Sequence, residues 1–146
     1  MNILILCTGN SCRSQIADGY LRQFVKNIAN VYSAGTQTHG VNPNAIRVMA
    51  EDGIDISQHT SNLLDEYSDI EFDYVITVCD NAKKVCPVFP GNGKMIHHSF
   101  SDPASAKGSD DEIMNSFRKV RDKIKLFCQV WSKSEILAPL EMTQNN

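Results

Sequence analysis

The sequence predicts an α/β fold in which a four-stranded parallel sheet carries helices on both faces. Two observations lead to this prediction. Short aliphatic segments alternate along the chain with longer segments whose apolar residues recur at helical spacing. The aliphatic segments are also apolar at consecutive positions, which is typical of parallel strands buried on both faces.

The elements are assigned from these patterns and from residues that begin or end helices. In the first half we expect a strand over 2–6, a loop over 7–14, a helix over 14–27, a strand over 30–33, and a helix that Asn42-Pro43 begins and Gly53 ends. In the second half we expect a helix over about 60–67, strands over 72–78 and 94–98, and a helix from the capping box of Ser109 and Glu112 to about Trp131. Residues 132–146 are polar and weakly patterned, so the expected organisation is one domain at 1–131 and a loose C-terminal tail at 132–146.

The composition is ordinary for a globular domain, with 42% hydrophobic and 21% charged residues. The net charge of -3 and the lack of a basic stripe argue against nucleic acid or an anionic membrane as a partner. No apolar run reaches the roughly 18 residues that span a bilayer, and the N-terminus lacks the basic region and cleavage site of a signal peptide. We therefore expect the protein in the cytoplasm.

The cysteines need an explanation, because structural disulfides are rare in the cytoplasm. There are five of them, and their spacing matches no paired zinc pattern, so reactive thiols are the leading interpretation. Cys128 lies on an apolar helix face and is expected in the core. The histidines (His39, His59, His97 and His98) lack a convincing ligand set, so no metal is expected; His59 is a candidate for a hydrogen bond near the loop over 7–14.

Cys7 and Arg13 enclose a Cys-x5-Arg loop between a predicted strand and a predicted helix. Backbone N–H groups and the helix N-terminus bind anions in such loops, and Arg13 can contact two oxygens of a tetrahedral anion. The same field favours a thiolate, so we expect Cys7 to be a nucleophile near neutral pH. A buried structural Cys7 with an exposed Arg13 is the simpler alternative, which the strand-to-helix context disfavours. The expected oxyanion-binding residues are Thr8, Gly9, Asn10, Ser11, Cys12, Arg13 and Ser14.

Individual loop residues have separate expected roles. Gly9 lets the backbone approach the ligand, and Asn10 holds the loop by side-chain to backbone hydrogen bonds. The Ser14 hydroxyl is expected to donate to the Cys7 sulfur. Cys12 either packs, which we favour, or forms a protective disulfide with Cys7.

Cys79 directly follows a predicted strand, as Cys7 does. Because the carboxyl ends of parallel strands meet at one edge of a sheet, the two thiols are expected on the same edge. Cys86 lies seven residues after Cys79. If the intervening segment is helical, the two α-carbons are roughly 10 Å apart, whereas a disulfide needs about 4.4–6.8 Å. Joining Cys79 to Cys86 therefore requires a local rearrangement.

The segment Cys7-Thr8-Gly9-Asn10-Ser11-Cys12-Arg13-Ser14 resembles the oxyanion loop of the low-molecular-weight tyrosine phosphatase superfamily, and more narrowly that of the thioredoxin-coupled arsenate reductases. The likeness continues through residues 31–35, 38–43, 54–61, 78–79, 86–87, 102–103 and 120–122, and covers about residues 2–128. It implies a phosphatase-like, flavodoxin-type three-layer sandwich.

The resemblance also implies a mechanism of arsenate reduction. Cys7 attacks arsenate while Asp102 acts as the general acid, although Asp before Pro is by itself an ordinary turn pattern. Cys79 then attacks the Cys7 sulfur, Cys86 takes over the disulfide, and thioredoxin reduces it. The thiols supply both electrons, so no cofactor is expected, and a monomer is assumed.

Some arsenate reductases of this group hold a potassium ion near the loop. Asn10 and Ser33 match its ligands, whereas Asp18 stands in place of a Glu and Asn62 in place of an Asp. The sequence leaves potassium binding open.

Two alternatives remain. A tyrosine phosphatase would share Cys7, Arg13 and Asp102, but would have no need of Cys79 and Cys86 and often has an aromatic residue where this chain has Ala104. A non-catalytic oxyanion-binding or redox-regulated interaction protein would bind the anion without turnover.

Overall fold

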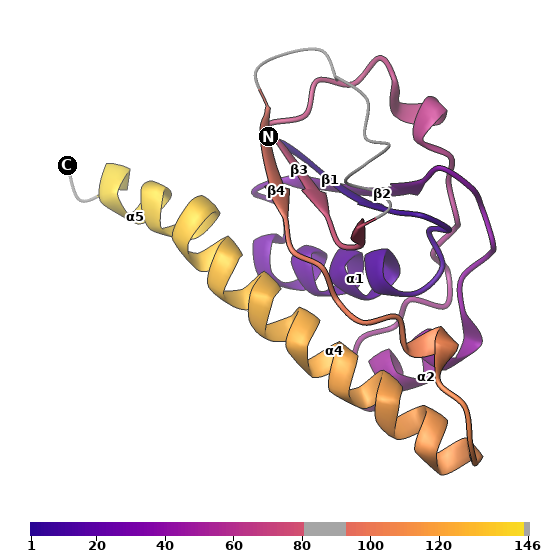
Figure 1. Cartoon of the computed structure of the whole chain (residues 1–146). Coiled ribbons are helices and arrows are strands. Elements are labelled where there is room, and N and C mark those ends of the chain that lie inside the picture. Colours follow the sequence, from indigo (N-terminus) through magenta and orange to yellow (C-terminus); the bar gives the residue numbers. More distant parts are fainter. Residues whose placement is uncertain (81–92, 145–146) are drawn as a thin grey trace.

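The computed structural model describes residues 1–80 and 93–144, and these residues form an α/β fold around a parallel sheet. The sheet has four strands in the order β2-β1-β3-β4 (Figure 1). The strands are β1 (Asn2–Cys7), β2 (Asn30–Gly35), β3 (Tyr74–Thr77) and β4 (Lys94–His97). All pairs are parallel, which confirms the sheet predicted from the sequence.

Strand β1 lies inside the sheet and is almost fully buried. Residues 3–6 are 0% exposed, because neighbouring strands cover both edges and packed side chains cover both faces. In the register, Leu6 pairs with Ala34 of β2 and with Thr77 of β3. The carboxyl ends of these strands therefore meet at one edge, where the segments after Cys7 and Thr77 continue.

The main helices are α1 (Arg13–Val25), α2 (Pro43–Glu51) and α4 (Asp110–Ser132). They pack against one another on one side of the sheet, below it in Figure 1. The predicted start of α4 is confirmed, since Ser109 Oγ accepts a hydrogen bond from the Glu112 backbone N–H at 3.2 Å. Among the described residues, no helix is long and apolar enough to span a membrane.

The helix expected over 60–67 is mostly absent, and only the short 3-10 helix η1 (Leu64–Tyr67) forms. The backbone of the preceding segment is used elsewhere. The Thr60 carbonyl accepts from Gln15 Nε2 at 3.0 Å, and the Asn62 carbonyl accepts from the Gly35 N–H at 2.9 Å. These bonds hold residues 60–62 against α1 and β2 instead of in a helical turn.

The expectation of a loose tail is wrong for residues 132–144. After α4 the chain continues as a π-helical turn (Lys133–Leu137) and as α5 (Ala138–Gln144). Apolar burial explains this continuation, since Ile136 is 2% exposed and Trp131 packs edge-on against Tyr74 with ring centroids 5.0 Å apart. The division of the chain at residue 131 stays a prediction.

Candidate active site

The loop between β1 and α1 surrounds a pocket of about 330 Å³ at the carboxyl edge of the sheet. Cys7 ends β1 and is 4% exposed, and Arg13 begins α1. Asp102 reaches the same pocket from the N-cap of the 3-10 helix η2 (Pro103–Ser105). The pocket is lined by Cys7, Thr8, Gly9, Ser11, Cys12, Arg13, His39, Asp102 and Ala104. The structure therefore brings together seven of the residues predicted to bind or act on an oxyanion, among them Cys7, Arg13 and Asp102.

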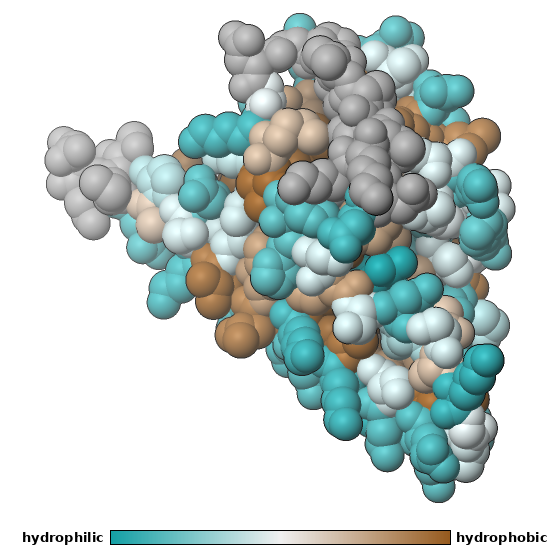
Figure 2. Space-filling view, viewed as in Figure 1, coloured by the Kyte–Doolittle hydropathy of each residue, from teal (hydrophilic) through white to brown (hydrophobic). Residues whose placement is uncertain are grey.

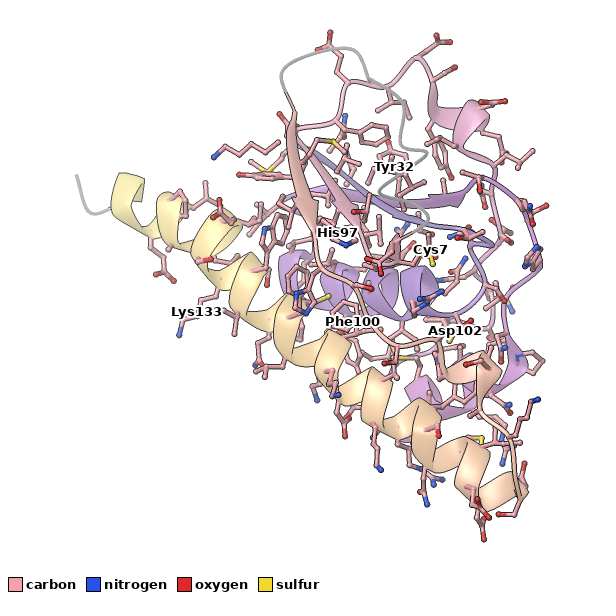
Figure 3. All side chains as sticks on the ribbon, viewed as in Figure 1. Cys7, Tyr32, His97, Phe100, Asp102 and Lys133 are labelled. Carbon is pink, nitrogen blue, oxygen red and sulfur yellow. The ribbon has the colours of Figure 1, made fainter. Side chains whose placement is uncertain are left out.

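The guanidinium of Arg13 is held by the segment that follows β4. Its Nη1 donates to the Phe100 carbonyl at 2.9 Å, and its Nη2 lies 3.9 Å from Asp102 Oδ2. The Arg13 side chain is 16% exposed and that of Asp102 is 45% exposed. Figure 3 shows Cys7 at the end of β1, with Phe100 and Asp102 on the segment that leads from β4 to α4. The Arg13 guanidinium and the Asp102 carboxylate thus lie side by side.

Asn10 holds the loop in shape, as the sequence predicted. It is 0% exposed and has a positive φ of 46°, a conformation that Asn tolerates better than most residues. Its Oδ1 accepts the Asn62 backbone N–H at 2.7 Å, and its Nδ2 donates to Ser14 Oγ at 2.9 Å. A donated hydrogen bond from Ser14 to the Cys7 sulfur stays a prediction.

Gln15 is a loop-supporting residue that the sequence did not reveal. It is 0% exposed, and its Nε2 donates to the Asn10 carbonyl at 3.1 Å as well as to Thr60. Its Oε1 lies 3.1 Å from His59 Nδ1, which confirms a hydrogen bond of His59 near the loop. A single glutamine in a helix has no sequence pattern that distinguishes it from a surface residue.

Gly9 and His39 lie against each other at the rim of the pocket. The His39 N–H donates to the Gly9 carbonyl at 3.0 Å, and a Cβ at position 9 would come within 2.5 Å of His39 Nδ1. The glycine is therefore required by the close approach of this ring. His39 also lines the pocket, which the sequence did not predict.

Cys79 lies next to Cys7, as the shared edge predicted. It is 4% exposed, its Sγ is 3.4 Å from Thr8 Oγ1, and its thiol is hydrogen-bonded to that of Cys7. This bond and burial raise the pKa of Cys7 well above its ordinary value, and they outweigh Arg13 and the Thr8 N–H, which lower it. Both effects oppose the ionisation of Cys7 that the sequence led us to expect, and a thiolate near neutral pH stays a prediction.

The three other cysteines, Cys12, Cys128 and Cys86, differ in where they lie. Cys12 is 6% exposed, which fits the favoured packing role, and burial raises its pKa to about 12. Cys128 is 0% exposed in the core, as expected. Cys86 lies outside the described residues. The four described cysteines are all free thiols.

Comparison with known proteins identifies the family. The sequence matches the family described as "Low molecular weight phosphotyrosine protein phosphatase" over residues 2–139. The chain belongs to this family. An arsenate reductase from Halalkalibacterium halodurans is 49% identical over 122 residues, which cover 84% of this chain and 88% of that protein. An arsenate reductase from Bacillus subtilis is 48% identical over 124 residues, with the same coverage of 84% and 88%.

Solved structures agree with this assignment. An arsenate reductase in an oxidized state is 28% identical, with a TM-score of 0.73 over 88% of this chain and 93% of that one. An arsenate reductase in a phosphate binding state is also 28% identical, with a TM-score of 0.68 over 91% and 97%. A low molecular weight protein tyrosine phosphatase from T. tengcongensis, 22% identical, has a TM-score of 0.74 over 91% and 99% and shares the fold.

A second hollow, of about 280 Å³, lies between α1, β2 and the segment that leads to η1. It contains Asp18, Ser33 and Asn62, three of the positions compared with potassium ligands. Asp18 is 4% exposed and its carboxylate is paired with the guanidinium of Arg22. Because an arginine already neutralises this carboxylate, the described residues do not fit a potassium site.

A third hollow, of about 630 Å³, is apolar and lies between α4 and the segment after β4. Its lining includes Phe127 and the exposed Leu126 and Val130, which are 62% and 59% exposed. Figure 2 shows apolar surface along this side of the molecule. None of the described cysteines and no carboxylate lines this hollow.

Proposed function

We propose that this member of the phosphatase family is an arsenate reductase, which converts arsenate to arsenite with its own thiols. The contact between the Cys7 and Cys79 thiols beside the oxyanion pocket carries this proposal. A phosphatase needs one thiol next to its anion site, whereas a reductase needs a second thiol that can reach the first. The relatives that are 48–49% identical bear the same name.

The first step uses the pocket. Arg13 and the loop N–H groups hold the arsenate oxygens, and the Cys7 proton passes to the bound dianion. Cys7 Sγ forms a bond to arsenic, and one As–O bond breaks. Asp102 gives a proton to the departing oxygen, which leaves as water. At 3.9 Å from the anion-binding arginine, Asp102 lies beside the bound oxyanion.

The second step is the reduction. The Cys79 thiolate attacks Cys7 Sγ, the S–As bond breaks, and its electron pair stays on arsenic, which leaves as arsenite. A Cys7–Cys79 disulfide remains. We propose that Cys86, which the sequence alone supports, then attacks Cys79, frees Cys7 and leaves a disulfide that thioredoxin reduces. We also propose that the protein acts as a monomer in the cytoplasm.

The test compares two activities of the same protein. Arsenate-dependent NADPH oxidation with thioredoxin and thioredoxin reductase measures reduction, and p-nitrophenyl phosphate hydrolysis measures attack by Cys7 alone. Cys7→Ser should lose both activities, whereas Cys79→Ser should keep hydrolysis and lose reduction. Hydrolysis by the wild type without arsenate-dependent oxidation would instead support a phosphatase, which shares Cys7, Arg13 and Asp102.

A further inference from the structure

A series of hydrogen-bonded polar side chains joins the residues on either side of Cys79 in the sequence. Thr77 and His97 are paired positions of β3 and β4, and Thr77 Oγ1 lies 2.7 Å from His97 Nδ1. The other ring nitrogen, His97 Nε2, lies 3.0 Å from Asp80 Oδ1. The histidine therefore joins a residue two positions before Cys79 to the residue directly after it.

These three side chains become more exposed from Thr77 to Asp80. Thr77 is 2% exposed, whereas the side chains of His97 and Asp80 are 23% and 75% exposed. When the buried Thr77 hydroxyl donates to Nδ1, the Nε2–H of His97 is free to donate to the Asp80 carboxylate. The His97 ring is thus held by Thr77 at Nδ1, and its Nε2–H points to the Asp80 carboxylate.

Cys79 itself lies two residues beyond the last paired position of β3, Thr77. The sheet register alone does not set the direction of its side chain. On the pocket side its Sγ lies 3.4 Å from Thr8 Oγ1. The contact of Asp80 with His97 holds the next residue of the backbone.

We propose that His97 is a positioning residue for Cys79, and that it acts through Asp80 to keep the Cys79 sulfur aimed at Cys7. This inference rests on the proposed function, because it concerns the attack of Cys79 on Cys7. Attack on a sulfur needs an aligned approach, so a small displacement of the attacking thiol lowers the rate strongly. Attack of Cys7 on the oxyanion does not use Cys79 and should be insensitive to His97. Figure 3 shows His97 on β4, separate from Asp102 on the segment that follows.

The two steps can be measured separately in a Cys86→Ser background, which stops the reaction at the Cys7–Cys79 disulfide. Single-turnover formation of this disulfide, followed by quenching and mass analysis, reports the Cys79 step. Hydrolysis of p-nitrophenyl phosphate reports the Cys7 step and correct folding. His97→Ala and Asp80→Asn should each slow disulfide formation at least about tenfold and leave hydrolysis within about twofold, because an exposed pair contributes little to stability.

The chain offers a matched control and a rescue. His98→Ala removes the adjacent histidine, which stacks on Phe127 with centroids 4.8 Å apart, and should leave disulfide formation unchanged. His97→Gln keeps an amide donor for Asp80 and should recover part of the rate that His97→Ala loses.

Unchanged disulfide formation in both His97→Ala and Asp80→Asn would overturn the inference, and so would equal losses of both activities, which indicate general damage. A wild type that hydrolyses p-nitrophenyl phosphate but forms no disulfide with arsenate would instead refute the proposed function, and the inference with it.

Discussion

The side-chain oxygen of Asn10 accepts the backbone N–H of Asn62 at 2.7 Å, across 52 residues of sequence. The amide nitrogen of the same side chain donates to Ser14 Oγ at 2.9 Å. One buried side chain therefore joins the oxyanion loop, the first turn of α1 and the segment before η1. These hydrogen bonds fix the shape of the loop through the fold itself.

Replacing Asn10 tests this role. Asn10→Ala leaves the buried hydrogen-bond partners of Asn10 unsatisfied, which costs about 1–3 kcal/mol for each such group. It also places an alanine at positive φ, which costs about 1–2 kcal/mol. Asn10→Gly loses the same hydrogen bonds but tolerates the backbone angle. Urea unfolding should therefore show both variants destabilised, with Ala worse than Gly by about 1 kcal/mol. Equal losses would mean that the φ of 46° carries no cost.

Asp102→Asn tests the assignment of the general acid. The Asn side chain can still accept the Ala104 N–H, which Asp102 Oδ1 accepts at 3.0 Å, so η2 should keep its N-cap. Phenyl phosphate has a poor leaving group that needs a proton, and its hydrolysis should fall by about 10²–10⁴-fold. Hydrolysis of p-nitrophenyl phosphate should fall much less, because p-nitrophenolate leaves without a proton. Similar losses for the two substrates would reject Asp102 as the acid.

The parts of the site that the sequence predicted are those defined by local pattern. Cys7, the loop and the start of α1 lie together in the chain, and strand topology places Cys79 on the same edge. The contacts that were not predicted join distant segments, such as Gln15 with Thr60, and leave no periodic signal. The two effects that raise the pKa of Cys7 were not predicted for the same reason, because a neighbouring thiol and burial are properties of the folded site.

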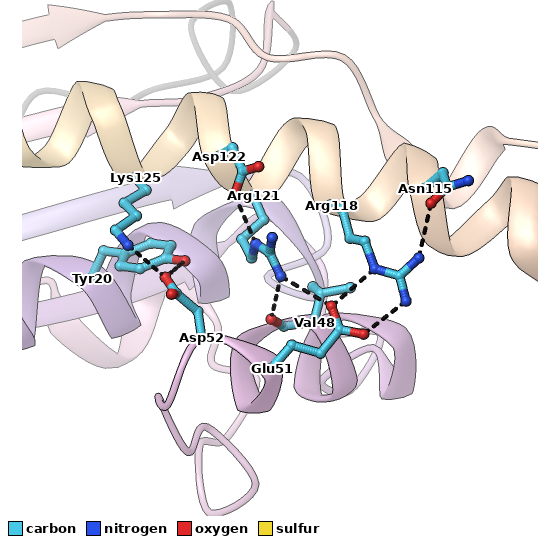
Figure 4. A network of polar contacts seen from close by, with 9 residues as sticks. All are labelled: Tyr20, Val48, Glu51, Asp52, Asn115, Arg118, Arg121, Asp122 and Lys125. Atoms are coloured by element: carbon cyan, nitrogen blue, oxygen red, sulfur yellow. Dashed lines mark hydrogen bonds and ion pairs between the residues drawn. The ribbon is translucent and has the colours of Figure 1, made fainter.

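Glu51 provides a test of stability at low pH. Arg118 donates to its two oxygens at 2.9 and 2.8 Å, and Arg121 adds a bond at 3.1 Å between α2 and α4 (Figure 4). These bonds, chiefly those of Arg118, hold the pKa of Glu51 at about 2, below its ordinary 4.5. A lowered carboxyl pKa stabilises the fold above the ordinary value, and this contribution is lost as the pH falls from 4.5 towards 2.

Urea unfolding of the wild type and of Glu51→Gln over this pH range checks the assignment. The wild type should be the more stable protein at pH 7, and the difference in free energy of unfolding should shrink as the pH falls from 4.5 towards 2. A difference that stays constant down to pH 2 would show that the ionised carboxylate is not what the arginines stabilise.

Ile136 tests whether the C-terminal helical segment belongs to the core. It is 2% exposed in the π-helical turn, whereas Leu140 of α5 is 41% exposed. Ile136→Ala should lower the free energy of unfolding by about 2–4 kcal/mol, because the cavity it leaves is enclosed by packed side chains. Leu140→Ala is the matched control and should cost under about 1 kcal/mol, since half-exposed apolar groups lose little burial. If the two variants unfolded at the same urea concentration as the wild type, the helix after Trp131 would be an appendage, and the loose tail expected from its polar composition would describe the protein in solution.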